Sequence, residues 1–219
     1  MSVRALKVWD LPTRLCHWSL VALVAMSWWS GEQGGEAFDY HQWSGYGILS
    51  LLLFRLAWGV VGGEYSRFAQ FVHGPRRVLC AVRDLLTPTP LAQPGHNPLG
   101  GWMVVALLIG LTVQTVTGLF ANDDIMNEGP LMAWVDKDLS DTLSGVHTIN
   151  FVVLLSLISM HVVAIVYHRL RKGEHLTLAM ITGRRMLPGA PPTVRTASPW
   201  LAAVLLALSA GMVAVLINL

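Results

Sequence analysis

The segment from residue 145 to residue 167 constrains the fold more than any other, because its 23 residues include no acidic or basic side chain. It carries two histidines, His147 and His161, which are fourteen residues apart. On an α-helix this separation covers about 21 Å, most of the hydrocarbon thickness of a bilayer. Fourteen steps of about 100° end about 40° short of whole turns, so the two imidazoles share nearly one face. The segment therefore predicts a membrane-spanning helix with one histidine near each surface.

Composition also indicates an integral membrane protein, since 53% of the 219 residues are hydrophobic and only 13% are charged. Five apolar stretches are long enough to cross a bilayer, at 11–30, 41–61, 99–120, 143–167 and 199–218. The predicted fold class is an all-α membrane protein, a four-helix transmembrane bundle with an additional fifth C-terminal transmembrane helix. Its expected parts are the bundle at 8–172, a cytoplasmic proline-rich linker at 173–197 and the fifth helix at 198–219.

The basic residues predict the orientation. Apart from Arg55 and Lys137, every Lys and Arg lies at or before the start of the first stretch, between the second and third, or between the fourth and fifth. The positive-inside rule then places these regions and the N-terminus in the cytoplasm and the C-terminus in the periplasm. The opposite side is acidic, with Glu32, Glu36, Asp39, Asp123, Asp124, Glu128, Asp136, Asp138 and Asp141.

Two further histidines lie at matching depths. His17 is about two turns into the first stretch from the cytoplasmic side, level with His161. His41 opens the second stretch at the outer side, level with His147. Two b haems, each held by two imidazoles, require pairs that face each other across a bundle at two levels. We therefore predict His17 and His161 as iron ligands of an inner haem, and His41 and His147 as iron ligands of an outer haem.

Each histidine taken alone has a plainer explanation. A buried histidine can hydrogen-bond a neighbouring helix or relay protons, and a haem-free proton-coupled transporter would use all four in this way. A zinc or non-haem iron centre needs three or four ligands around one ion, which the separation of His147 from His161 forbids. The matched depths favour haem. No Cys-x-x-Cys-His motif is present, which excludes covalent attachment of a c-type haem.

Arg55 lies inside the second stretch, fourteen residues after His41, and should face the bundle near the depth of His161. We interpret it as a cofactor-binding residue, a counter-charge for a haem propionate or a quinone carbonyl, because an unpaired buried guanidinium is costly. The alternative is that Arg55 reaches the cytoplasmic headgroups. Three other histidines are expected to be interfacial or solvated groups of cytoplasmic loops: His73, His96 and His175.

Several motifs in order along the chain resemble the bacterial cytochrome b561 and hydrogenase-type cytochrome b family. They are VWDLPTRLCHW at 8–18, FRLAWG at 54–59, GHNPLG at 95–100, TGLF at 117–120 and the paired histidines of the fourth stretch. The resemblance covers about residues 8–172 and implies a four-helix bundle of the bacterial inner membrane with two b haems. The ligands it implies are His17, His41, His147 and His161. The fifth apolar stretch departs from this four-helix core.

The resemblance implies respiratory electron transfer between the quinone pool and a periplasmic partner, such as a c-type cytochrome or a hydrogenase. The acidic loop at 122–141 would suit a lysine-rich c-type cytochrome, although such a loop can also be merely solvated. An alternative branch oxidises superoxide and reduces ubiquinone, but acidic outer loops disfavour access of an anion. We expect a quinone site near Arg55, contact with membrane lipid and no nucleic-acid partner. Whether the chain is an enzyme or a membrane subunit, and whether it forms a homo- or hetero-oligomer, stays open.

Overall fold

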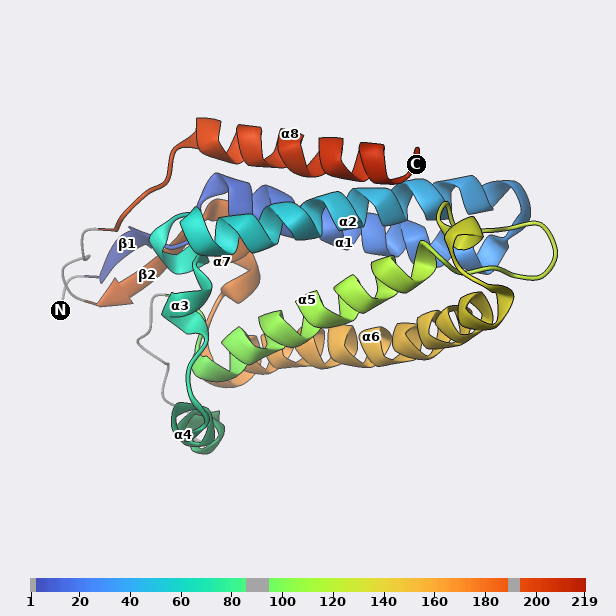
Figure 1. Cartoon of the computed structure of the whole chain (residues 1–219). Coiled ribbons are helices and arrows are strands. Elements are labelled where there is room, and N and C mark those ends of the chain that lie inside the picture. Colours follow the sequence, from blue (N-terminus) through green and yellow to red (C-terminus); the bar gives the residue numbers. More distant parts are fainter. Residues whose placement is uncertain (1–2, 86–94, 189–193) are drawn as a thin grey trace.

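A computed structural model describes residues 3–85, 95–188 and 194–219 and shows a mainly helical chain (Figure 1). Five long helices correspond to the five apolar stretches: α1 (Leu11–Gln33), α2 (Phe38–Val61), α5 (Pro98–Gly118), α6 (Lys137–Lys172) and α8 (Pro199–Leu216). Three shorter helices lie in the connections: α3 (Phe68–Phe71), α4 (Pro75–Leu85) and α7 (Leu176–Thr182). Single 3-10 turns are η1 (Gly35–Ala37), η2 (Glu64–Ser66) and η3 (Met132–Trp134). Two short strands complete the described elements: β1 (Val3–Lys7) and β2 (Arg184–Pro188).

Among the residues that the structure describes, four helices are long and apolar enough to cross a membrane. They are the segment Gly35–Val61, which contains α2, together with α5, α6 and α8. The chain is therefore a multi-pass membrane protein with an all-α spanning part. The C-terminal helix α8 is one of the four, whereas α1 is not, because polar residues such as Arg14 and His17 make its 23 residues less apolar. A fifth span, at α1, stays a prediction.

The long helices pack as two pairs, α1 with α2 and α5 with α6, and the pairs meet where α2 contacts α5 (Figure 1). A cluster of buried aliphatic side chains fills the middle of the bundle, with contributions from Ile48, Leu52, Leu111 and Leu154. Helix α8 runs alongside α2. Its buried Ala202 packs with Phe54 and Trp58, so the fifth helix is part of the packed bundle.

The end of the bundle with the N-terminus carries a two-stranded antiparallel sheet, and we call it the sheet end (Figure 1). In this sheet Val3 is opposite Pro188 and Lys7 is opposite Arg184. The segment 173–197, which we expected to be a cytoplasmic proline-rich linker, contains α7 and β2 among its described residues. The pairing of β1 with β2 joins residues about 180 positions apart in sequence, which no local pattern reveals.

The loop between α5 and α6 lies at the opposite end, which we call the loop end (Figure 1). Helix α6 begins there, two turns before its apolar part, because Asp136 caps it by accepting a hydrogen bond from Leu139 N at 2.8 Å. The helix ends at the sheet end, where Gly173 adopts a left-handed conformation. Helix α6 therefore runs from one end of the bundle to the other and places His147 and His161 at different levels.

Asp10 joins three elements at the sheet end. It caps α1 by accepting from Thr13 N at 2.8 Å. It also accepts from Ser66 Oγ at 2.8 Å and from the indole Nε1 of the fully buried Trp58 at 3.2 Å. The start of α1, the last turns of α2 and the turn η2 are thereby held in register, which fixes the depth of His17 relative to Arg55.

Candidate functional site

His41 of α2 and His147 of α6 meet at the loop end. Their ring centroids are 6.2 Å apart and the ring planes are inclined at 70°. Two metal–nitrogen bonds of about 2 Å each, together with the two ring radii, separate the centroids of imidazoles that share one metal by roughly 6 Å. The structure thus brings this predicted pair together at the separation that one iron ion between them requires.

Hydrogen bonds fix the tautomer of both rings. His41 Nδ1 lies 2.8 Å from the carbonyl oxygen of Ser27, and His147 Nδ1 lies 2.9 Å from the carbonyl oxygen of Gln114. A carbonyl oxygen only accepts, so each Nδ1 carries the proton and donates it. Each Nε2 therefore keeps its lone pair for a metal, which is the arrangement found for ligating histidines whose second nitrogen is anchored.

Two glycines allow these rings to lie against the neighbouring helices. A Cβ on Gly31 of α1 would lie 3.0 Å from His41 Nδ1, and a Cβ on Gly118 of α5 would lie 2.9 Å from His147 Cε1. Any larger residue would push the imidazole away from the carbonyl that anchors it. Each ring of the pair is therefore seated in a recess that a glycine provides.

A cavity of about 290 Å³ opens beside this pair. Both histidines line it, together with apolar Ile48, Leu49 and Leu111. A Cβ on Gly45, one turn after His41, would meet nothing within 4 Å, so the space beside the ring is open. An apolar cavity with two imidazoles of fixed tautomer fits a haem, whose faces are apolar and whose iron takes one nitrogen from each side.

His17 of α1, His161 of α6 and Arg55 of α2 lie in the halves of their helices that are nearer the sheet end. The His17 ring also lies edge-on against Trp18, with 5.0 Å between centroids. Arg55 is only 6% exposed, and its guanidinium lies 4.9 Å from the centroid of the Phe68 ring. It is buried rather than extended to the surface, as its interpretation as a cofactor-binding residue requires.

His96 was missed by the sequence analysis. We expected an interfacial or solvated side chain, but its ring lies between Trp9 and Phe71, with centroid distances of 4.6 Å and 4.8 Å. Burial, together with the charge of Arg55, lowers its pKa to about 3, so the imidazole is neutral at physiological pH. A single histidine in a loop has no periodicity, so only its place in the GHNPLG motif could have singled it out.

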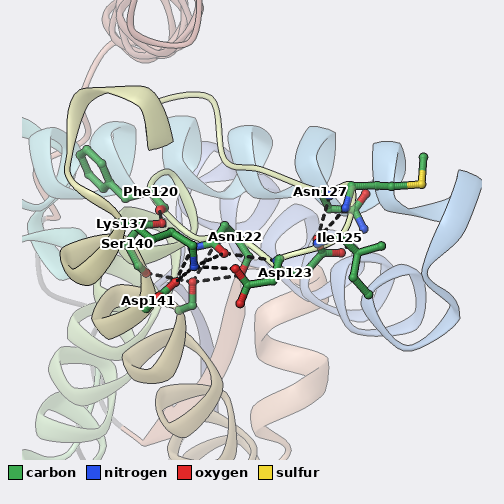
Figure 2. A network of polar contacts seen from close by, with 11 residues as sticks. Phe120, Asn122, Asp123, Ile125, Asn127, Lys137, Ser140 and Asp141 are labelled. Atoms are coloured by element: carbon green, nitrogen blue, oxygen red, sulfur yellow. Dashed lines mark hydrogen bonds and ion pairs between the residues drawn. The ribbon is translucent and has the colours of Figure 1, made fainter.

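The acidic residues of the loop end are all exposed, and several are organised by hydrogen bonds (Figure 2). Backbone amides of Asn127 and Ile125 donate to Asp123 and hold the pKa of that carboxyl below its usual range. Asn122 donates to Ser140 and Asp141, which joins the loop to the start of α6. The loop has a defined shape, and its tip exposes Ile125 and Met126 at 84% and 87%.

A bundle of apolar helices that pairs two anchored imidazoles across a cavity is the architecture of a membrane b-type haem protein. The chain belongs to the prokaryotic cytochrome b561 family, whose sequence profile matches residues 8–183. It is therefore a membrane cytochrome that transfers electrons through haem b. Comparisons with curated proteins and with solved structures found no match. The matched region ends at the glycine after α7, before β2 and α8.

Proposed function

We propose that the protein carries electrons across the bacterial inner membrane through two b haems, between the quinone pool and a periplasmic redox partner. The observation that carries the proposal is the His41–His147 pair, with its 6.2 Å centroid separation and anchored Nδ1 atoms. The second haem would be held by His17 and His161. Haem supplies one-electron chemistry, and the protein supplies ligands, position and surroundings.

Helix α6 separates the two proposed haem sites, and a cluster of buried aliphatic side chains lies in the bundle. His147 and His161 are fourteen residues apart on α6, about 21 Å along the helix axis. The buried side chains of Ile48, Leu52 and Leu111 occupy the middle of the bundle. An electron would therefore enter and leave at different ends of the molecule.

The sheet end is proposed as the cytoplasmic side and as the place where quinone reacts. It carries exposed basic residues such as Arg76, Arg77 and Arg171, which the positive-inside rule assigns to the cytoplasm. Buried Arg55 supplies a fixed donor beside the predicted ligands His17 and His161. A quinone carbonyl that accepts from such a donor would lie close to the haem at this end.

The loop end is proposed as the docking face for a lysine-rich c-type cytochrome. The loop end carries nine exposed acidic residues and one basic residue, Lys137, and one of the acidic residues, Asp123, lines the cavity beside the His41–His147 pair. Such a face attracts a cationic partner and steers its association. The same charge repels superoxide, so the superoxide oxidase alternative receives no support from this surface. Family membership implies haem b, which speaks against a haem-free transporter.

The test uses the purified protein in liposomes with a quinol and an oxidised, lysine-rich c-type cytochrome. We expect reduction of the cytochrome at a rate that falls as ionic strength rises, because salt screens surface charges. Neutralising Glu36→Gln and Asp39→Asn together should slow the reaction severalfold, whereas Arg77→Gln at the sheet end should not. Prompt quinone reduction by added superoxide without any c-type cytochrome would overturn the proposal in favour of superoxide oxidation.

A further inference from the structure

Unpaired buried nitrogens gather at the sheet end. Within the residues that the structure describes, five buried side-chain nitrogens lack a hydrogen-bond partner: Arg14 Nε, His17 Nδ1, Arg55 Nη1, Arg67 Nε and His96 Nδ1. At the loop end, by contrast, both ligand histidines have their Nδ1 atoms paired. Buried polar groups in folded proteins are normally satisfied, so a local cluster of unpaired nitrogens, three of them on arginine side chains that can only donate, indicates a hydrogen-bonding group that binds there.

The side chains of Arg55 and His96, which carry two of these nitrogens, both lie close to the ring of Phe71. The Arg55 guanidinium lies 6.0 Å from the centroid of Phe71, and the His96 ring centroid lies 4.8 Å from the same ring. Arg55 and His96 therefore lie around Phe71 at the sheet end, where His17 and His161 are the predicted haem ligands.

The missing acceptor should be negatively charged. Asp10 is an acidic side chain that interacts electrostatically with Arg55, but both its oxygens already accept hydrogen bonds from Thr13, Trp58 and Ser66. The guanidinium has five N–H groups, so a quinone carbonyl could accept from one of them, but a neutral carbonyl alone would leave the charge of the buried guanidinium uncompensated. A carboxylate satisfies both needs, because a charge-assisted hydrogen bond to Arg is stronger than a neutral one.

We propose that His96 Nδ1 and Arg55 Nη1 donate hydrogen bonds to a propionate carboxylate of the haem held by His17 and His161. His96 is thereby a positioning residue of that haem rather than an iron ligand. This inference rests on the proposed second haem site. It gives the histidine of the GHNPLG motif a role that the sequence analysis did not assign.

The test compares His96→Phe with His96→Asn by redox titration of the haems in the full-length protein. Phenylalanine keeps the ring between Trp9 and Phe71 but has no donor, whereas asparagine places an N–H near the position of Nδ1. Without the donor the propionate charge is less compensated, so oxidised haem is favoured. We expect the sheet-end haem of His96→Phe to become about tenfold harder to reduce, about 59 mV for a one-electron couple. The loop-end haem should not change.

Two controls make the result specific. The potential that is missing in His161→Ala identifies the sheet-end haem, and His175→Phe alters an exposed histidine at the same end and should leave both potentials unchanged. If His96→Phe fails to load the sheet-end haem, recovery of that haem in His96→Asn supports the proposal. Unchanged potentials in His96→Phe, or a His96→Asn protein that behaves like His96→Phe, would overturn it. A wild-type protein without a sheet-end haem would instead refute the proposed second haem site.

Discussion

At the loop end, the space left by the missing side chain of a glycine allows each predicted ligand, His41 or His147, to reach the backbone carbonyl that accepts its Nδ1 hydrogen bond. Gly31 and Gly118 lie where the imidazoles of His41 and His147 pass closest to the neighbouring helices. Both glycines lie at helix positions where sequence alone suggests only a local loss of helix propensity. Their contacts instead place the backbone of α1 and α5 against His41 on α2 and His147 on α6, the predicted iron ligands.

The substitution Gly118→Ala tests this contact. The added methyl group would lie 2.9 Å from His147 Cε1, so the ring must turn away from the Gln114 carbonyl. We expect the loop-end haem to be lost or bound at well under half occupancy, with the sheet-end haem retained, as measured by haem absorbance per protein. Gly211→Ala is the matched control, because a Cβ there meets nothing within 4 Å. Full haem content in Gly118→Ala would show that the recess is not needed.

At the scale of whole elements, the junction around Asp10 determines how α1 is held against α2. Asp10→Ala removes the N-cap, at about 1 kcal/mol, and leaves the buried Trp58 Nε1 unpaired, at about 1–3 kcal/mol. The expected loss of stability is therefore roughly 2–4 kcal/mol, measured as reversible denaturation in detergent. Asp136→Ala removes a cap with one exposed hydrogen bond and should cost only about 1 kcal/mol. Equal losses in the two variants would contradict the role of the Asp10 junction.

The loop between α5 and α6 should depend on pH through Asp123. Its pKa is lower in the folded loop than the value of 3.8 for a free aspartate, because the amides of Asn127 and Ile125 donate to the carboxylate. The carboxylate thus stabilises the loop above pH 3.8, and this contribution is lost as the pH falls below that value. We expect amide protection at 125–127 to fall in this range. Asp123→Asn should show low protection at every pH, and Asp138→Asn should behave like the wild type.

At the scale of the whole molecule, the helices followed from local patterns, and the contacts between distant segments did not. Long apolar runs are a property of each segment, so they predicted the positions of α1, α2, α5, α6 and α8. The fourteen-residue spacing within one helix also indicated that His147 and His161 lie at different depths of the bundle. The fold class is confirmed at the level of an all-α membrane bundle with four candidate spans, and the family is confirmed over 8–183.

Three features could not be predicted from the sequence, because each depends on contacts between residues far apart in sequence. The pairing of β1 with β2 joins the residues before α1 to the residues after α7. The glycine recesses depend on which helix faces which. The packing of the His96 ring depends on Trp9 and Phe71, which lie far from it in sequence. The cytoplasmic position of the sheet end and the four ligand assignments stay predictions.

The number of haems per chain tests the central claim most directly. Purified wild-type protein should contain two b haems per polypeptide, both low-spin with two histidine ligands. His161→Ala should contain one, with the spectrum and potential of the loop-end haem, because the His41–His147 pair does not depend on that ring. Two haems with unchanged spectra and potentials in His161→Ala would contradict the account, as would a single haem in the wild type.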